Sequence, residues 1–163
     1  FYKMFVPFSS LSETSRVWIY QANRELSSNE ITEIKQLTIE YLNSWTAHGK
    51  PIRNSFEIRY NRFLVIAADD DQYIGGCSLD DLGRFIQVLE QKYNINLLDK
   101  MNVSFRKGEE IYYVPLIDFK KMAQQKLVSN ETIVFNNLVS NLYEYQHFWE
   151  TPAFDSWHSR FMK

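Results

Sequence analysis

Three adjacent aspartates and the only cysteine of the chain lie within one stretch, FLVIAADDDQYIGGCSLDD, at residues 63–81. Its apolar first part has the composition of a buried strand, and Asp69, Asp70 and Asp71 follow at the expected strand end. Carboxylates can hold Mg²⁺ or Ca²⁺, and a cysteine at a helix start can act as a nucleophile. The stretch is therefore a candidate for a metal, phosphate or thiol site.

Two well-known motifs do not fit this stretch. An apolar strand ending in aspartate is typical of P-loop ATPases, but these also need G-x-x-x-x-G-K-[ST] to hold phosphate, and no segment matches it. In an EF-hand that starts at Asp69, Ile74 would replace the required glycine and Asp80 the required glutamate. Asp69, Asp70 and Asp71 remain candidates for a looser divalent-metal site, and the alternative is a solvated acidic loop.

Cys77 is the candidate catalytic residue. Gly75 and Gly76 indicate a tight turn, and Ser78 is the expected N-cap of a helix whose N-terminus would favour a thiolate. Nearby aspartates act against a thiolate, and the base would have to be one of three histidines distant in sequence. The alternative is that Cys77 is a small apolar residue at a turn.

Two further groups are candidates for binding a ligand or partner. Arg59 and Arg62 in RYNRF could contact an anion, and the alternative is ordinary surface arginines paired with nearby carboxylates. His158 and Arg160 in SWHSRF combine imidazole, guanidinium and tryptophan, which suits a carboxylate ligand. The alternative there is a terminal turn that aromatic residues anchor to the fold.

Hydrophobic periodicity predicts the elements that position these residues. Ser27 and Glu30 have the spacing of a capping box at the start of the first helix. The remaining pattern predicts strands at 16–22, 101–105, 110–114 and 131–136, a hairpin at 55–69, and helices at 27–48, 79–93, 116–127 and 140–150.

The hairpin at 55–69 determines which side chains share a face. With Asn61 and Arg62 as a two-residue turn, Tyr60 faces Phe63 and Ile58 faces Val65. The opposite face then carries Glu57, Arg59, Leu64 and Ile66, together with Trp18 and Tyr20. A half-apolar face of this kind needs cover from the C-terminal segment, a ligand or a second copy of the chain, so Trp18 and Tyr20 are partner-binding candidates.

The predicted fold class is α+β, with an antiparallel sheet that carries helices on one face. The order β-α-β-β-α-β is typical of a ferredoxin-like core, at residues 15–106, and β-α-β-α follows as a C-terminal extension at 107–163. A length of 163 residues favours a single domain.

Composition narrows the function class. A formal charge of -2 and a pI near 5.9 argue against nonspecific nucleic-acid binding. One cysteine excludes an intramolecular disulfide and fits a reducing cytoplasm. No apolar run reaches the roughly 20 residues of a membrane span, and the start lacks a signal-peptide pattern, with Met4 a candidate initiator. We expect no cofactor.

Five phrases, SRVWIYQANR, FEIRYNRF, GCSLD, TIVFNNLV and SWHSRF, occur in an order that resembles a family of short uncharacterised bacterial proteins. The likeness covers nearly the whole chain. Members of that family often carry the label "ABC transporter ATPase", although this sequence has neither a P-loop nor an LSGGQ-type signature. The resemblance implies a cytoplasmic bacterial protein that is not embedded in a membrane, and it assigns no catalytic residues.

Together these observations predict a small non-catalytic domain that binds a protein or small-molecule partner, with a homodimer through the sheet face as one form of that binding. The alternative is a small enzyme that uses Cys77 as nucleophile or Asp69–Asp71 as a metal site.

Overall fold

A computed structural model describes residues 4–71 and 73–163. The chain forms two compact units, which are described separately. Unit 1 runs to Leu98 and includes Ser140–Leu142, and unit 2 comprises Asp99–Val139 and Tyr143–Lys163. No described helix is long and apolar enough to cross a membrane.

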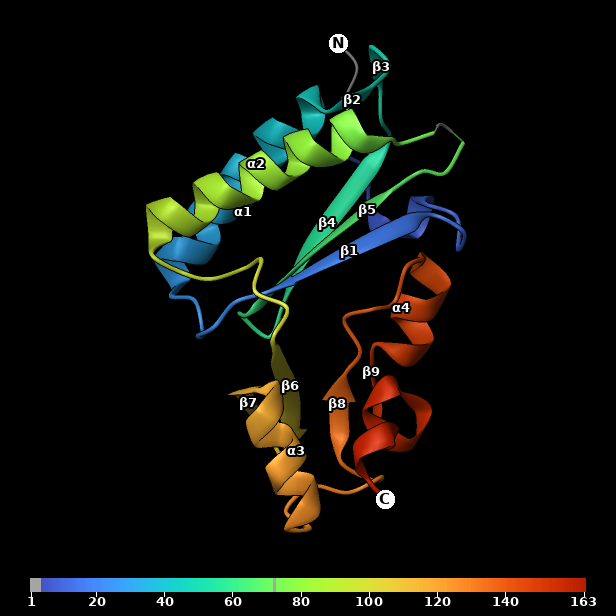
Figure 1. Ribbon diagram of the computed structural model, residues 1–163. Helices are drawn as coiled ribbons and strands as arrows, with labels where there is room; N and C mark the ends of the chain where they lie inside the picture. The colour runs from blue at the N-terminus through green and yellow to red at the C-terminus, as the bar shows by residue number, and fades with distance from the viewer. Residues whose placement is uncertain (1–3, 72) are drawn as a thin grey trace. The chain divides into compact units, whose positions relative to one another are not determined.

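Unit 1 is a three-stranded antiparallel sheet, in the order β1-β5-β4, with two long helices on one face (Figure 1). Its elements are η1 (Phe8–Ser10), β1 (Arg16–Gln21), α1 (Ser28–Ser44), β2 (Thr46–Ala47), β3 (Lys50–Pro51), β4 (Asn54–Arg59), β5 (Phe63–Ala68) and α2 (Gly76–Tyr93).

The start of α1 confirms the predicted capping box. The Ser27 hydroxyl accepts a hydrogen bond from the Glu30 amide, and the Glu30 carboxylate accepts one from the Ser27 amide at 2.8 Å. Arg24 donates two further bonds to the same carboxylate, at 2.9 and 2.8 Å. These hydrogen bonds, first from Arg24 and then from the Ser27 amide, lower the pKa of Glu30 to about 2.

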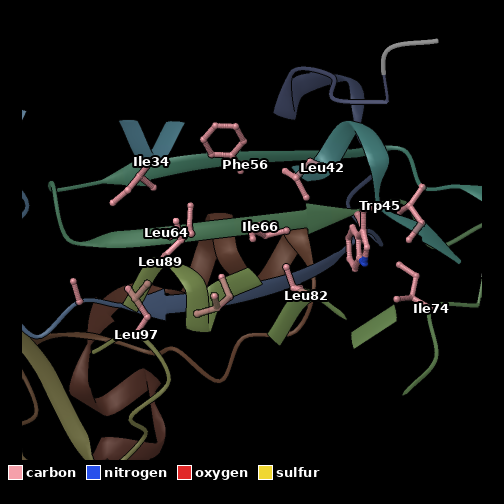
Figure 2. Close-up of a cluster of buried hydrophobic side chains, with 14 of the residues drawn as sticks. Ile34, Leu42, Trp45, Phe56, Leu64, Ile66, Ile74, Leu82, Leu89 and Leu97 are labelled. Carbon is pink, nitrogen blue, oxygen red and sulfur yellow. The ribbon is translucent and has the colours of Figure 1, made fainter. Parts of the chain in front are cut away.

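The core of unit 1 lies between the sheet and the two helices. Figure 2 shows side chains of α1, β4, β5 and α2 gathered into one cluster, with Trp45 at one end of it. Its most deeply buried members include Leu42, Trp45, Ile66 and Ile86. Helices α1 and α2 each contribute an apolar stripe to this core.

The β4–β5 hairpin corrects the predicted register. The loop has three residues, Tyr60, Asn61 and Arg62. The partner of Phe63 is therefore Arg59, and not Tyr60 as predicted. Tyr60 and Asn61 both adopt the left-handed conformation, with φ of 53° and 54°. A slip of one residue in one strand moves all its side chains to the other face relative to the partner strand.

The slip changes which residues share each face of the sheet. Phe56 and Ile58 now pair with Ile66 and Leu64, and this apolar face packs against the helices. Glu57 and Arg59 lie on the opposite face. The predicted grouping of Glu57 and Arg59 with Leu64 and Ile66 is therefore wrong, and these two residues instead share a face with Phe63, Val65 and Ala67.

Unit 2 is built on a four-stranded antiparallel sheet in the order β7-β6-β8-β9. Val103, Phe105, Phe119, Val128, Val134 and Ala153 form its apolar core. Its elements are β6 (Asn102–Lys107), β7 (Glu110–Pro115), α3 (Leu116–Gln124), β8 (Ile133–Phe135), α4 (Leu142–Phe148, whose first residue belongs to unit 1), β9 (Glu150–Pro152), η2 (Ala153–Asp155) and η3 (Trp157–Phe161).

The α+β class with antiparallel sheets is confirmed, but the ferredoxin-like sheet is not completed. Strand β6, the expected fourth strand of that sheet, pairs with β7 and β8 in unit 2. The β6–β7 hairpin explains this, because the two-residue turn with Gly108 at φ 59° ties β6 to its sequence neighbour. The compact units accordingly divide at Leu98, before β6.

Candidate functional site

Cys77 lies in the first turn of α2 and is exposed. The helix starts three residues earlier than predicted, so its N-cap is Gly75, and Ser78 instead donates from its hydroxyl to the Thr46 carbonyl at 2.8 Å. His48 does not contact the thiol in any described interaction; its ring stacks on Tyr73, with centroids 6.3 Å apart. The structure therefore brings no described base to Cys77.

The three aspartates at the end of β5 do not gather into a described metal site. Asp69 accepts a 3.4 Å contact from Arg53, and Asp70 and Asp71 are exposed. No group of three or more potential metal ligands occurs within residues 4–71 and 73–163. The described geometry favours the solvated acidic loop.

Trp18 and Tyr20 pack against the core of unit 1. The ring of Trp18 meets that of Trp45 edge-on, with centroids 5.7 Å apart. Burial raises the pKa of Tyr20 to about 12. Both side chains are half-buried, so the structure places Trp18 and Tyr20 at the margin of this core.

The two hairpin arginines differ in their surroundings. Arg59 lies 3.6 Å from the Glu57 carboxylate, and its guanidinium is 5.2 Å from the centroid of the Tyr60 ring. Burial lowers the pKa of Arg62, and the carboxylate of Glu25 partly offsets this. Arg59 thus has a carboxylate neighbour on its own strand, and Arg62 is half-buried near Glu25.

His158 of unit 2 is fully buried. Its Nδ1 is 2.7 Å from the Ser156 hydroxyl, its ring stacks on Trp157 with centroids 3.8 Å apart, and its edge meets Phe119. Burial first, and the charge of Arg160 second, lower its pKa to about 4. Neither His158 Nε2 nor Trp157 Nε1 has a hydrogen-bond partner among the described residues.

The Ser156–His158 pair has the short hydroxyl–imidazole distance of an activated nucleophile. Both side chains are buried, however, so a substrate could reach the hydroxyl only after the C-terminal turns had moved. The neutral imidazole is therefore best described as a core residue. This is the docked terminal turn that the sequence offered as the alternative for SWHSRF.

Arg160 is exposed and forms part of what we name the C-terminal cluster, which consists of Lys120, Trp157, Arg160 and Phe161. Its guanidinium lies 5.7 Å from the Trp157 ring centroid and 5.9 Å from that of Phe161. The ammonium of Lys120, on α3, lies 5.8 Å from the same Phe161 centroid. Two cations from different elements thus share one ring.

The cations of the cluster have no carboxylate partner in the described part of the chain, since no ion pair of the structure includes Lys120 or Arg160. The two charges are at most about 12 Å apart, because both lie within 6 Å of the Phe161 centroid. The Arg160 Nε donates to the Trp157 carbonyl at 3.2 Å, which helps to hold the guanidinium over the rings.

The sequence predicted Arg160 as a binding residue but missed Lys120. Forty positions separate the two, and Lys120 follows Phe119 within a helix that reads only as amphipathic. Its role depends on α3 lying next to η3, which no local pattern reports.

Comparisons with protein-family models, with curated proteins and with solved structures find no match to this chain.

Proposed function

We propose that this protein is a non-catalytic binding protein and that its C-terminal cluster recognises an anionic group on a ligand or partner. The observation that carries the proposal is the convergence of Lys120 and Arg160 on the Phe161 ring without an ion-pair partner among the described residues. Bringing two cations together is electrostatically unfavourable, and an anion between or beside them would remove that cost.

The chemistry of the two cations indicates an oxyanion. Arginine presents a planar fork that matches the oxygens of a carboxylate, phosphate or sulfate, and lysine adds a point charge. The aromatic rings hold both heads in place before a ligand arrives, which reduces the entropy lost on binding. Because the surrounding rings are partly exposed, the same surface can also contact an apolar part of the ligand.

The proposal is tested by titrating the ¹⁵N-labelled protein with sodium sulfate at constant ionic strength, with sodium chloride as the reference salt. The indole resonance of Trp157, assigned with Trp157→Phe, should shift and saturate with sulfate alone. Arg160→Gln and Lys120→Gln should each weaken binding at least about fivefold. A shift that chloride reproduces would contradict the proposal.

Lys35→Gln is the matched control for these variants. Lys35 is an exposed lysine on α1 of unit 1, so its replacement removes one charge from a helix without touching the cluster. If Lys35→Gln weakens sulfate binding as much as Lys120→Gln, the protein attracts anions only through its net charge.

The resemblance to the bacterial family supports two further proposals, a cytoplasmic location and the lack of an ATPase function. The residues that would cradle a nucleotide are missing from the sequence, whatever label the family carries. ATP with Mg²⁺ should therefore not raise the melting temperature beyond the effect of an equal concentration of sulfate. A larger rise with ATP would support a nucleotide site.

A further inference from the structure

The indole of Trp157 connects the surface of unit 2 with a buried titratable group. The guanidinium of Arg160 lies 5.7 Å from the centroid of this ring, and the imidazole of His158 stacks on it with centroids 3.8 Å apart. The anion site proposed above therefore lies one ring away from an imidazole that the proposed function does not use.

A positive charge on His158 is unfavourable in this position. In the neutral tautomer that donates from Nδ1 to the Ser156 hydroxyl, Nε2 is an unpaired acceptor, whereas an imidazolium would carry an N–H at Nε2 without a described acceptor. The ring is also fully buried. Unpaired donors in such surroundings are costly, so the imidazole stays neutral at ordinary pH.

The charged groups around this imidazole come from three elements. Arg160 lies on the same 3₁₀ helix and lowers the pKa of His158 by charge repulsion. Lys120 of α3 adjoins Phe119, which meets the edge of the imidazole ring. Asp118 of α3 and Asp155 of η2 are the nearest acidic residues along these elements, and both are exposed. The nearest cations are thus also those that would hold the anion.

We propose that the C-terminal cluster and His158 are coupled, so that binding an oxyanion at Lys120 and Arg160 promotes protonation of the buried imidazole. The inference rests on the proposed function. An anion cancels the repulsion that Arg160 exerts on the imidazolium. By thermodynamic reciprocity, the protonated protein must then bind the anion more tightly by the same factor. The site would take up its ligand together with a proton and release both at higher pH.

The experiment follows the imidazole Cε1–H resonances of the folded protein from about pH 7 to about pH 3, in sulfate and in chloride of equal ionic strength. Sulfate remains mainly the dianion throughout this range. The chain has three histidines, and exposed His48 and His147 act as internal controls. Sulfate should raise the His158 midpoint by about 0.7 pH unit, which is a fivefold coupling, and leave the other two unchanged.

Two variants separate the possible results. Arg160→Gln should raise the His158 midpoint in chloride and abolish the further effect of sulfate. His158→Gln should bind sulfate at neutral pH and lose the His158-dependent rise in affinity on acidification. If this variant does not fold, the wild-type titration decides alone.

Sulfate binding without a rise of the His158 midpoint would overturn the coupling and leave the proposed function standing. No sulfate effect on Trp157 at any pH would overturn both. If unit 2 unfolds before the midpoint is reached, sulfate affinities at about pH 7 and pH 5 replace it, and an affinity that does not rise on acidification overturns the coupling.

Discussion

The two units bury polar groups in different ways. In unit 1 the indole of Trp45 donates to the Ser78 carbonyl at 3.0 Å, the amide of Asn54 donates to the Leu42 and Ile52 carbonyls, and the Thr38 hydroxyl donates to the Ile34 carbonyl. In unit 2 the adjacent His158 and Trp157 each keep a buried nitrogen without a described partner.

This difference indicates which changes should lower the stability of each unit. Hydrogen bonds from buried side chains to backbone carbonyls lock unit 1 into one arrangement, although Asn54 Oδ1 lacks a described partner. Two of the unsatisfied buried atoms of unit 2, Trp157 Nε1 and His158 Nε2, lie within one ring of the cationic surface, and a third is the Tyr113 hydroxyl. Unit 1 should therefore respond mainly to changes in its core, and unit 2 to charge and pH.

The largest effect should come from Trp45→Ala. Trp45 is 1% exposed, so the substitution leaves a large cavity and removes the hydrogen bond from the indole to the Ser78 carbonyl. We expect a loss of about 4 kcal/mol in the free energy of unfolding, measured with urea, and loss of hydrogen-exchange protection in α1 and α2. Val88→Ala, at a position 54% exposed, should cost less than about 0.5 kcal/mol. If Trp45→Ala lowers the free energy of unfolding as little as Val88→Ala does, the stability of unit 1 does not depend mainly on its core.

Acidification should weaken unit 2 first. The folded pKa of His158 is about 4, below the value of 6.5 for a free histidine, so the unfolded state binds the proton more tightly. Stability is therefore complete above about pH 6.5 and falls as the pH drops toward 4, by about 3 kcal/mol in total. Hydrogen exchange of the β6 and β8 amides, corrected for intrinsic rates, measures the loss. In His158→Gln the fall in stability on acidification should be much smaller. An equal fall in this variant would show that a group other than His158 causes it.

Glu30 should make unit 1 sensitive at lower pH. Its folded pKa of about 2 lies below the unfolded value of 4.5, so its contribution is present above about pH 4.5 and disappears as the pH falls toward 2. Glu30→Ala should cost about 1 kcal/mol at neutral pH, because one half of the capping box is lost. Glu30→Gln retains the acceptor without the charge and should cost less, with no titration in this range. Melting temperatures at pH 7 and pH 3 distinguish these outcomes.

The smallest effect concerns the end of α2. Asn94 has φ of 51° and donates its amide to the Glu90 carbonyl. Asn94→Ala should lower the free energy of unfolding by about 0.9 kcal/mol, since alanine tolerates the left-handed conformation poorly. Asn94→Gly should change it by only about 0.3 kcal/mol. Urea denaturation of both variants checks this. Equal stabilities would show that the backbone there relaxes on substitution.

Short-range patterns predicted much of the fold. The capping box of Ser27 and Glu30 depends on neighbouring residues, and it is present. The register of the β4–β5 hairpin was wrong because Asn61 alone suggests a two-residue turn, while the structure also places bulky Tyr60 at positive φ. The unfavourable backbone conformation of Tyr60 is offset by the burial of Phe56 and Ile58, which this register places on the core face.

The candidate site was predicted only in part. Arg160 was identified because an arginine next to aromatic residues is a local signal, but His158 belongs to the core and not to the surface. Lys120 was missed because its neighbours in sequence give no sign of Phe161.

By itself the sequence determined the α+β class, the helices and most strand positions, because periodicity and capping act within a few residues. Only the tertiary structure decided that β6 joins the second sheet, that Trp18 and Tyr20 face the helices, and that Lys120 shares a ring with Arg160. These features depend on contacts between distant segments, whose free energy comes from burying apolar surface and not from local preference.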